Sequence, residues 1–190
     1  MQVGGGVGRG GRNSRPVPHR AISRVTIKAP VFLTQFLRQN SGREEEEGAA
    51  CVTHARVCLH APSSVSSVLN RDVKQFGKQH MFDANEETCW NSDQGARQWV
   101  ALDFPHTVKV SQLHIQFQGG FSSRLCTLEG EELLLGQLVK ISELYPEDVN
   151  AMQISFLPLE VFRLKITFEN STDFFGRIVV YHLRVLGERL

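Results

Sequence analysis

The sequence is poor in the features that mark zinc-binding, membrane-spanning and secreted chains. Its four cysteines form no Cys-x-x-Cys pair, which argues against a structural zinc site. No run of 18 apolar residues is present, so no transmembrane helix is expected. The N-terminus has no apolar stretch behind its charged residues, so no secretory signal is visible. A reducing compartment with free, buried or half-buried thiols fits this composition best.

Motifs typical of enzymes are also missing. The chain has no Gly-x-Ser-x-Gly, no His-Glu-x-x-His and no P-loop. Its seven histidines are scattered, and His114 and His182 fall on the expected outward faces of strands, where a solvated or paired histidine is usual. Adjacent carboxylates such as Glu86 and Glu87 point apart on a turn or strand. We therefore expect no enzyme.

Acidic residues are absent from the first part of the chain. Residues 1–43 carry eight basic side chains and no acidic one, and four glutamates follow at 44–47. The last 143 residues carry 13 basic and 16 acidic side chains. That part therefore lacks the basic excess of a nucleic-acid-binding domain, and direct nucleic-acid binding is not expected.

Residues 1–52 differ in composition from the rest. The stretch VGGGVGRGGRNSRP is rich in Gly and Arg and cannot bury a core, so we expect a disordered N-terminal extension. Three alternatives remain open: a transit peptide, an RNA-tethering arm that a single Arg-Gly-Gly supports weakly, and a long N-terminal variant of a shorter protein.

From about residue 62 the hydrophobic pattern becomes that of β-strands. Apolar and polar residues alternate in four segments, at 100–104, 113–117, 162–168 and 179–185. This period predicts strands with one buried face, with Phe162 and Tyr181 inward and Val180 and His182 outward. Shorter strands are expected at 124–129, 138–144 and 152–156, and one helical turn at 78–82. Turn signals separate the segments, so residues 62–190 are predicted to form an all-β jelly-roll sandwich.

The two tryptophans, Trp90 and Trp99, lie within ten residues of each other. A loop that leads into a strand needs an anchor, and a buried indole supplies a large ring and an N–H donor. Asp83, Asn85 and Thr88 precede the first tryptophan, and Asp and Asn side chains fold back on backbone N–H groups in compact turns. We expect these five residues to form a structural staple.

The stretch FDANEETCWNS…QWVALDF resembles the Asp-x-Asn-x-x-Thr-x-Trp…Gln-Trp signature of the discoidin family, the factor V/factor VIII type C domains. The closing stretch FRLKITFENSTDFFGRIVVYHLRVLGE is similar to the last two strands of that family. The resemblance covers about residues 62–188 and implies a galactose-binding-like jelly roll. Secreted members often join the chain ends by a disulfide, but no cysteine follows Cys126 here, which agrees with an intracellular location.

The resemblance to the discoidin family also implies a metal site. Many members hold calcium near the Asp-x-Asn-x-x-Thr loop, so Asp83, Asn85 and Thr88 are candidates for a weak calcium site. The family's usual acidic ligand on the last strand falls at His182, which weakens such a site. We therefore favour a metal-free Asx turn and no cofactor.

Sugar-binding members of the fold use loops at one end of the sandwich, which correspond here to residues 70–75, 118–124 and 170–177. Exposed aromatic rings beside Gly and Arg are typical partner anchors. The candidate partner-binding residues are Phe121, Arg124, Phe174, Phe175 and Arg177. The alternative is that one of these phenylalanines caps the core. Basic residues do not cluster around the aromatics, so membrane binding is not expected.

Three longer stretches carry a more specific resemblance: SSVLNRDVKQFGKQHMFDANEETCWNSDQG, VSQLHIQFQGGFSSR and TDFFGRIVVYHLRVLGE. They are similar to the small nuclear-receptor-associated proteins that partner the testicular orphan receptor 4. The resemblance implies a protein of the nucleus, and also of the cytoplasm, that binds this receptor and represses its transcriptional activity. Two other classes remain open: a discoidin-like module for carbohydrate or another small ligand, and an adaptor subunit of an intracellular complex.

Overall fold

The computed structural model describes residues 23–24, 27–28, 55–56, 61–131 and 136–190. Their elements are β1 (Ser23–Arg24), β2 (Ile27–Lys28), β3 (Ala55–Arg56), β4 (Ser63–Val65), η3 (Leu69–Arg71), α1 (Val73–Phe76), η4 (Lys78–Met81), β5 (Trp90–Asn91), β6 (Arg97–Phe117), β7 (Ser123–Glu131), β8 (Leu138–Leu144), β9 (Gln153–Ser171) and β10 (Val179–Arg189). The extension predicted for residues 1–52 lies outside the described residues apart from β1 and β2, as do Cys51 and Cys58.

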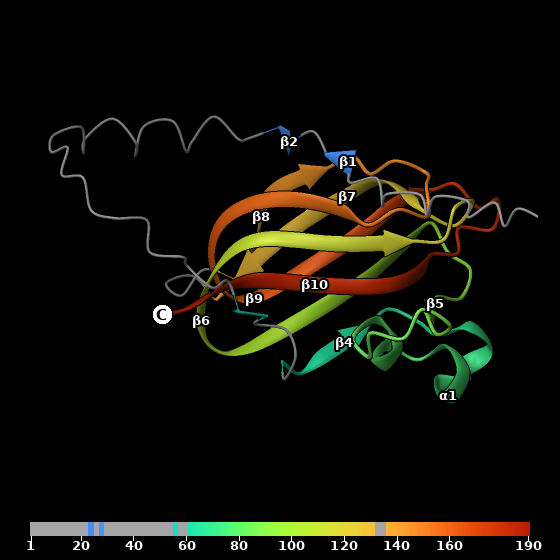
Figure 1. Ribbon diagram of the computed structural model, residues 1–190, viewed down its shortest axis with the longest axis horizontal. Helices are drawn as coiled ribbons and strands as arrows, with labels where there is room; N and C mark the ends of the chain where they lie inside the picture. Colours follow the sequence, from blue (N-terminus) through green and yellow to red (C-terminus); the bar gives the residue numbers. More distant parts are fainter. Residues whose placement is uncertain (1–22, 25–26, 29–54, 57–60, 132–135) are drawn as a thin grey trace, which may run out of the picture.

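Two long strands, β6 and β9, fold the sheet into two layers. Residues 97–103 of β6 pair antiparallel with residues 163–169 of β9, and the pairing is then interrupted until Val108 meets Val161. Both strands turn over near this interruption, on the left of Figure 1, so their other halves lie in the opposite layer. The strand order is β2-β8-β7-β9-β6-β10-β3, with β4 beside β6. The predicted all-β jelly-roll sandwich is confirmed.

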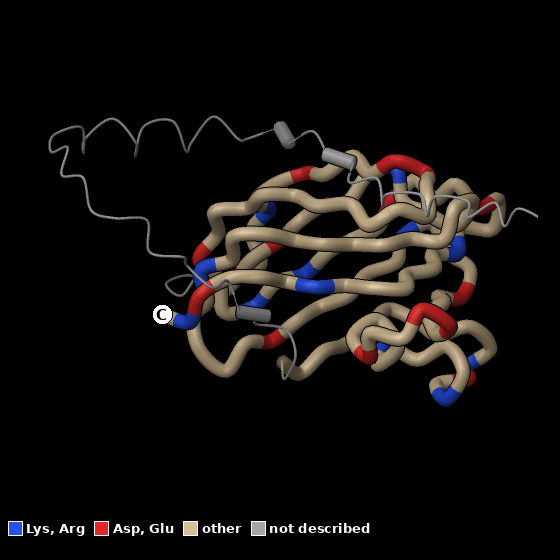
Figure 2. The backbone as a smooth tube through the Cα atoms, viewed as in Figure 1, with Lys and Arg blue, Asp and Glu red and all other residues tan. Residues whose placement is uncertain are grey.

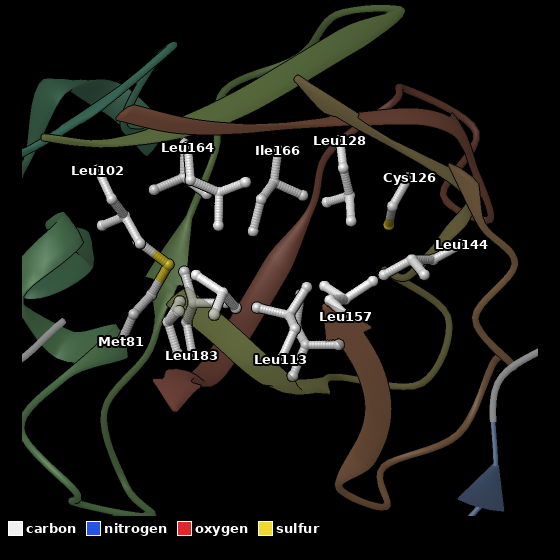
Figure 3. Close-up of a cluster of buried hydrophobic side chains, with 14 of the residues drawn as sticks. Met81, Leu102, Leu113, Cys126, Leu128, Leu144, Leu157, Leu164, Ile166 and Leu183 are labelled. Atoms are coloured by element: carbon white, nitrogen blue, oxygen red, sulfur yellow. The ribbon is translucent and has the colours of Figure 1, made fainter. Parts of the chain in front are cut away.

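The apolar core lies between the two layers. Leu102 and Ile166 of one layer face Leu113 and Leu157 of the other, and all four are buried (Figure 3). Met81 of η4 reaches the same core from the side, so the short helical segment before β5 closes one flank of the sandwich. Burial of these side chains is the main stabilising contribution to a fold of this kind.

Several elements agree with the sequence analysis. The short strand expected at 138–144 is present as β8, Leu138–Leu144. The expected helical turn is present as η4 at Lys78–Met81. Residues 70–75, expected as a loop, belong mostly to η3 and α1; Asp72 caps α1 by accepting hydrogen bonds from the backbone N–H groups of Lys74 and Gln75.

Four expectations about strand faces and ends are wrong. The segments 100–104 and 113–117, expected to be separated by a turn, are both parts of β6. The segments 152–156 and 162–168 are not separate strands but parts of β9, which runs through the bend without a turn. At the bend Val161 and Leu164 point inward, so Phe162 is only partly buried. A register shift in β10 between Val180 and His182 moves Val180 into the core, leaves Tyr181 partly exposed and buries His182.

The two cysteines in the described part of the chain are free thiols, as the sequence analysis expects. Cys126 is buried in the core, and this burial raises the pKa of its thiol to about 12. Cys89 is half-buried, and desolvation raises its pKa as well. Both thiols therefore stay protonated at neutral pH and serve as small apolar groups.

Candidate functional site

One end of the sandwich, opposite the bend, consists of four loops at residues 92–96, 118–122, 145–152 and 172–178. Loop 145–152 supports loop 118–122, because the Gly119 N–H donates to Asn150 Oδ1 at 2.7 Å and the Gly120 N–H donates to Asp148 Oδ1 at 2.8 Å. Ser122 Oγ also donates to Asp148 Oδ1 at 2.7 Å. The hydrogen bonds from Ser122 and then Gly120 hold the pKa of Asp148 below its usual range, so this carboxylate is a charged acceptor at neutral pH.

The loop at 172–178 forms a tight turn around the carboxylate of Asp173. Asp173 Oδ2 accepts hydrogen bonds from the backbone N–H groups of Phe175 and Arg177, each at 3.1 Å. The Arg177 guanidinium donates to both oxygens of the same carboxylate, at 3.2 Å each. The Arg177 contact is the main cause of the lowered pKa of Asp173. A charge-assisted, two-pronged contact of this kind fixes the shape of the loop.

Two phenylalanines project from this turn. Phe174 is 93% exposed and Phe175 is 55% exposed, and their ring centroids lie 5.2 Å apart in an edge-to-face arrangement. Behind them, the Arg177 guanidinium carbon lies 4.9 Å from the ring centroid of Phe121 and 6.0 Å from that of Phe175. The loop end therefore presents an apolar tip on a rigid, charge-stabilised base.

The structure brings together four of the five candidate partner-binding residues: Phe121, Phe174, Phe175 and Arg177. Arg124, expected both at the end of loop 118–124 and at the start of the strand 124–129, is the second residue of β7. Its side chain is exposed, and its charge contributes to the lowered pKa of Asp148 behind the larger effect of Ser122. We call Phe121, Phe174, Phe175 and Arg177 the aromatic tip.

Trp90 anchors the loop at 92–96 to the core of the sandwich. Its side chain is 0% exposed, its Nε1–H donates to the Ser67 carbonyl oxygen at 3.0 Å, and its ring centroid lies 6.0 Å from that of Phe168. Ser92, two residues later, accepts a hydrogen bond from the Ile178 N–H at 2.8 Å and donates its own N–H to the Ile178 oxygen at 2.9 Å. The segment that follows Trp90 is thereby attached to the start of β10.

Trp99 is not the second buried anchor that the sequence analysis expects. It lies partly buried on the outer face of the sheet, in a depression of about 290 Å³ that charged side chains of β6, β7 and β9 also line. The buried neighbour is Gln98, whose Oε1 accepts hydrogen bonds from Ser66 and Ser67 at 2.5 and 2.8 Å. Its Nε2 donates to the Asp93 carbonyl oxygen at 3.0 Å. The buried anchor at the start of β6 is therefore the polar side chain of Gln98 and not the indole ring of Trp99.

The Asp83–Thr88 turn is held by local hydrogen bonds. Asp83 Oδ1 accepts from the Asn85 N–H at 2.9 Å, and Asp83 Oδ2 accepts from Thr88 Oγ1 at 2.7 Å. Asn85 Oδ1 accepts from the Glu87 N–H at 3.0 Å. His80 Nδ1 also lies 3.0 Å from Asp83 Oδ2. A ring that donates to the carboxylate competes with a cation there, so this donor set fits an Asx turn better than calcium.

His80 makes this turn sensitive to pH. Its Nε2 lies 2.8 Å from the Lys74 carbonyl oxygen, and this contact, followed by the one with Asp83, raises the pKa of His80 above its usual 6.5. The stabilisation is therefore complete below pH 6.5 and is lost as pH rises through the folded-state pKa. We expect the difference in unfolding free energy between the native chain and His80→Gln to shrink from pH 5.5 to pH 8.5 in urea titrations. A constant difference across this range would contradict the assignment.

Two further features of the described ranges concern metal-ligating clusters and long apolar helices. No group of three or more His, Cys, Asp or Glu side chains among residues 61–131 and 136–190 is arranged to hold a metal ion. No helix in the described part of the chain is long and apolar enough to cross a membrane.

The fold is similar to that of solved binding modules. A chitosan-binding module from a Paenibacillus sp. IK-5 chitosanase/glucanase has a TM-score of 0.57 at 12% identity, covering 70% of this chain and 98% of that one. An F5/8 type C domain from Bacteroides fragilis has a TM-score of 0.59 at 12% identity, covering 69% and 93%. A family 32 carbohydrate-binding module from C. perfringens, solved with galactose, has a TM-score of 0.57 at 18% identity, covering 69% and 97%. The chain is thus a discoidin-like β-sandwich of the class to which binding modules belong.

Sequence relatives identify the family more narrowly. The nuclear receptor 2C2-associated protein of Homo sapiens is 61% identical over 140 residues, which are 73% of this chain and 100% of the relative. The proteins of that name from Xenopus laevis and Danio rerio are 66% and 61% identical, covering 66% and 70% of this chain and 92% and 95% of their own lengths. No protein-family model matches the chain. The chain belongs to the family of nuclear receptor 2C2-associated proteins.

Proposed function

We propose that this chain is a non-enzymatic interaction module that binds a nuclear receptor, the testicular orphan receptor 4, and lowers its transcriptional output. The support is the family: its members are named for association with a nuclear receptor, and none of those compared is named as an enzyme. The fold is one that other proteins use for binding. This function places the chain in the nucleus, and also in the cytoplasm, and requires no cofactor.

The observation that carries the proposed binding surface is the aromatic tip. An exposed pair of phenylalanines costs solubility unless a partner covers it, and large apolar side chains of this kind are the usual anchors of protein interfaces. Asp173 and Arg177 hold the turn by two-pronged contacts, so little conformational entropy is lost when the tip binds. We place the receptor contact on this tip.

Replacing both exposed phenylalanines tests the surface. We expect Phe174→Ala/Phe175→Ala to weaken receptor binding by about 30-fold or more, since removal of one anchor typically costs about 2 kcal/mol. The measurement is calorimetric titration of the full chain against the separate receptor domains, with and without calcium. Phe156→Ala is the matched control, because Phe156 is 57% exposed on another part of the molecule.

The titration separates the outcomes. Normal binding by the control, loss by the double variant and no effect of calcium support the proposal. Equal binding by both variants moves the contact away from the aromatic tip. Absence of binding to every receptor domain overturns the proposed function. A reporter assay with the same variants then tests repression, which follows either from blocking the receptor's protein partners or from blocking its contact with DNA.

Carbohydrate binding is the second candidate function. The observation that favours it is the contact of the Arg177 guanidinium with the rings of both Phe121 and Phe175, at a loop end of a sandwich shared with sugar-binding modules. Specific binding on a glycan array that Phe121→Ala abolishes would favour this function. An adaptor role remains a third candidate, and the native size of the assembly in cells distinguishes it from a one-to-one complex with the receptor.

A further inference from the structure

The flank of the sandwich between β8 and the first half of β9 has two strand edges that the rest of the domain does not cover. Strand β8 pairs with β7 on one side, and residues 153–161 of β9 pair with β6 on one side. Nearer the bend, a cavity of about 250 Å³ with a mainly apolar lining that includes Ile141, Leu159 and Val161 lies between the same two strands. Uncovered edges offer backbone N–H and C=O groups to any extended segment.

A segment of the same chain lies on both edges. Strand β1 pairs in parallel with β9, with Ser23 opposite Gln153 and Arg24 opposite Ile154. Strand β2 pairs antiparallel with β8, with Ile27 opposite Leu144 and Lys28 opposite Glu143. Figure 1 shows β1 and β2 along the upper side of the molecule, beside the strands of this flank. Strands β1 and β2 thus pair with one strand of each layer at the open side of the sandwich.

Charge favours this placement. Residues 129–160, which include β8 and the first half of β9, contain seven acidic side chains and one basic side chain, Lys140. Three of these carboxylates, Glu129, Glu131 and Glu143, already pair with Lys165, Arg163 and Lys140, so the net negative charge of the flank is smaller than the count of acids. Residues 1–43 contain eight basic side chains and no acidic one. Some of the carboxylates, red in Figure 2, lie along the upper side of the molecule. Opposite charges on two segments steer their encounter and disfavour other partners.

We propose that the flank between β8 and β9 is a docking site for an extended basic peptide strand, and that strands β1 and β2 of this chain occupy it. The sequence SRVTIK suits the site, since Val, Thr and Ile are strand-forming residues and Arg24 and Lys28 carry the complementary charge. Docking by strand addition derives affinity from main-chain hydrogen bonds and specificity from the neighbouring side chains. This site is separate from the aromatic tip.

Hydrogen exchange on the full chain tests the occupant. Arg24→Pro/Ile27→Pro places two prolines in the docking strand, where each removes a backbone donor. We expect amides in 142–145 and 153–156 to exchange at least about tenfold faster in this variant. Gln35→Pro/Gln39→Pro is the matched control, with two prolines in the same extension, and is expected to leave exchange unchanged. Equal exchange in all three chains overturns the proposal.

Charge reversal gives a second, independent measurement. Lys28 and Glu143 are opposite in the register, and like charges directly opposite each other destabilise a strand pair. Glu143 also pairs with Lys140 and accepts a hydrogen bond from Tyr145 Oη, so Glu143→Lys accelerates exchange at 142–145 for more than one reason. Lys28→Glu alone is expected to accelerate this exchange, and the double reversal is expected to restore protection relative to Glu143→Lys alone. Failure of the double variant to restore protection contradicts the proposed register.

A peptide experiment separates binding within one chain from binding between chains. A labelled peptide of residues 19–30 is expected to bind the double-proline variant at least about tenfold more tightly than the native chain, whose site is occupied. Equal affinity of the peptide for the two chains overturns the proposal, and so does absence of binding to both. Protection that rises with protein concentration, with a doubled mass by light scattering, would instead assign the strand to a second copy and overturn occupancy by the same chain.

Discussion

Trp90→Ala is expected to lower the free energy of unfolding by about 3–5 kcal/mol, the usual cost of removing a large aromatic side chain from a core. Trp90 is 0% exposed, and its ring is the first of three that contact one another in series, since Phe168 lies 6.0 Å from Trp90 and 5.8 Å from Phe117 between centroids. Its loss also leaves the Ser67 carbonyl oxygen without its indole donor.

Trp99→Ala is the matched control, with the same chemical change nine positions later. Because Trp99 lies partly buried on an outer face, we expect a cost of about 1 kcal/mol or less. Urea unfolding followed by far-ultraviolet circular dichroism measures both variants without relying on tryptophan fluorescence. Equal costs would mean that the two rings share the anchoring role, contrary to the burial of Trp90 and Gln98 seen here.

Trp90→Phe separates the ring from its N–H group. This variant keeps most of the apolar surface and removes the donor to Ser67, so about 1–2 kcal/mol of destabilisation is expected. A cost as large as that of Trp90→Ala would show that the hydrogen bond, rather than the ring, holds the loop. The staple residues predicted from sequence thus differ in how strongly they stabilise the fold.

The all-β class and most strand positions were predictable because period-two alternation is a direct result of burying one sheet face. Leu113, Ile115 and Phe117 are buried as the alternation predicts, and β8 has its predicted bounds. Alternation fails where the register shifts, because an additional residue changes the face of the residues on one side of the shift. Val180 is therefore in the core in place of Tyr181, whereas Leu183 and Val185 beyond the shift are buried as predicted. Phe162 lies at the bend of β9.

The residues of the aromatic tip were predictable from the sequence, but the hydrogen bonds that hold the surrounding loops were not. Phe121, Phe174, Phe175 and Arg177 could be selected because aromatic residues beside Gly and Arg occur in expected turns. Asp173 follows a turn signal and could have been added. Asp148 lies 26 residues from Ser122 in the sequence, and no local pattern predicts their hydrogen bond. Gln98 was missed because the sequence does not indicate which of two neighbours, a glutamine or a tryptophan, is buried, and the tryptophan is the more apolar of the two.

Gly176→Ala is expected to disturb both the fold and the aromatic tip. Gly176 has a φ of +80°, and a Cβ atom there would lie 2.3 Å from the Gly95 carbonyl oxygen and 2.8 Å from its carbon. Backbone cannot yield as a flexible side chain can, so the two loops must separate and the Gly95 N–H bond to the Phe175 oxygen is lost. We expect a cost of about 2–4 kcal/mol, from left-handed strain together with overpacking.

Gly120→Ala is the control that isolates backbone strain. Gly120 has a similar φ of +83°, but a Cβ atom there would meet nothing within 4 Å, so about 1–2 kcal/mol of strain is expected without a clash. If receptor binding depends on the aromatic tip, Gly176→Ala weakens it well below the unfolding temperature while Gly120→Ala leaves it nearly unchanged. Equal losses of unfolding free energy in the two variants would show that the close contact between Gly95 and Gly176 does not contribute to stability. The loop between the two tryptophans would then not position the tip.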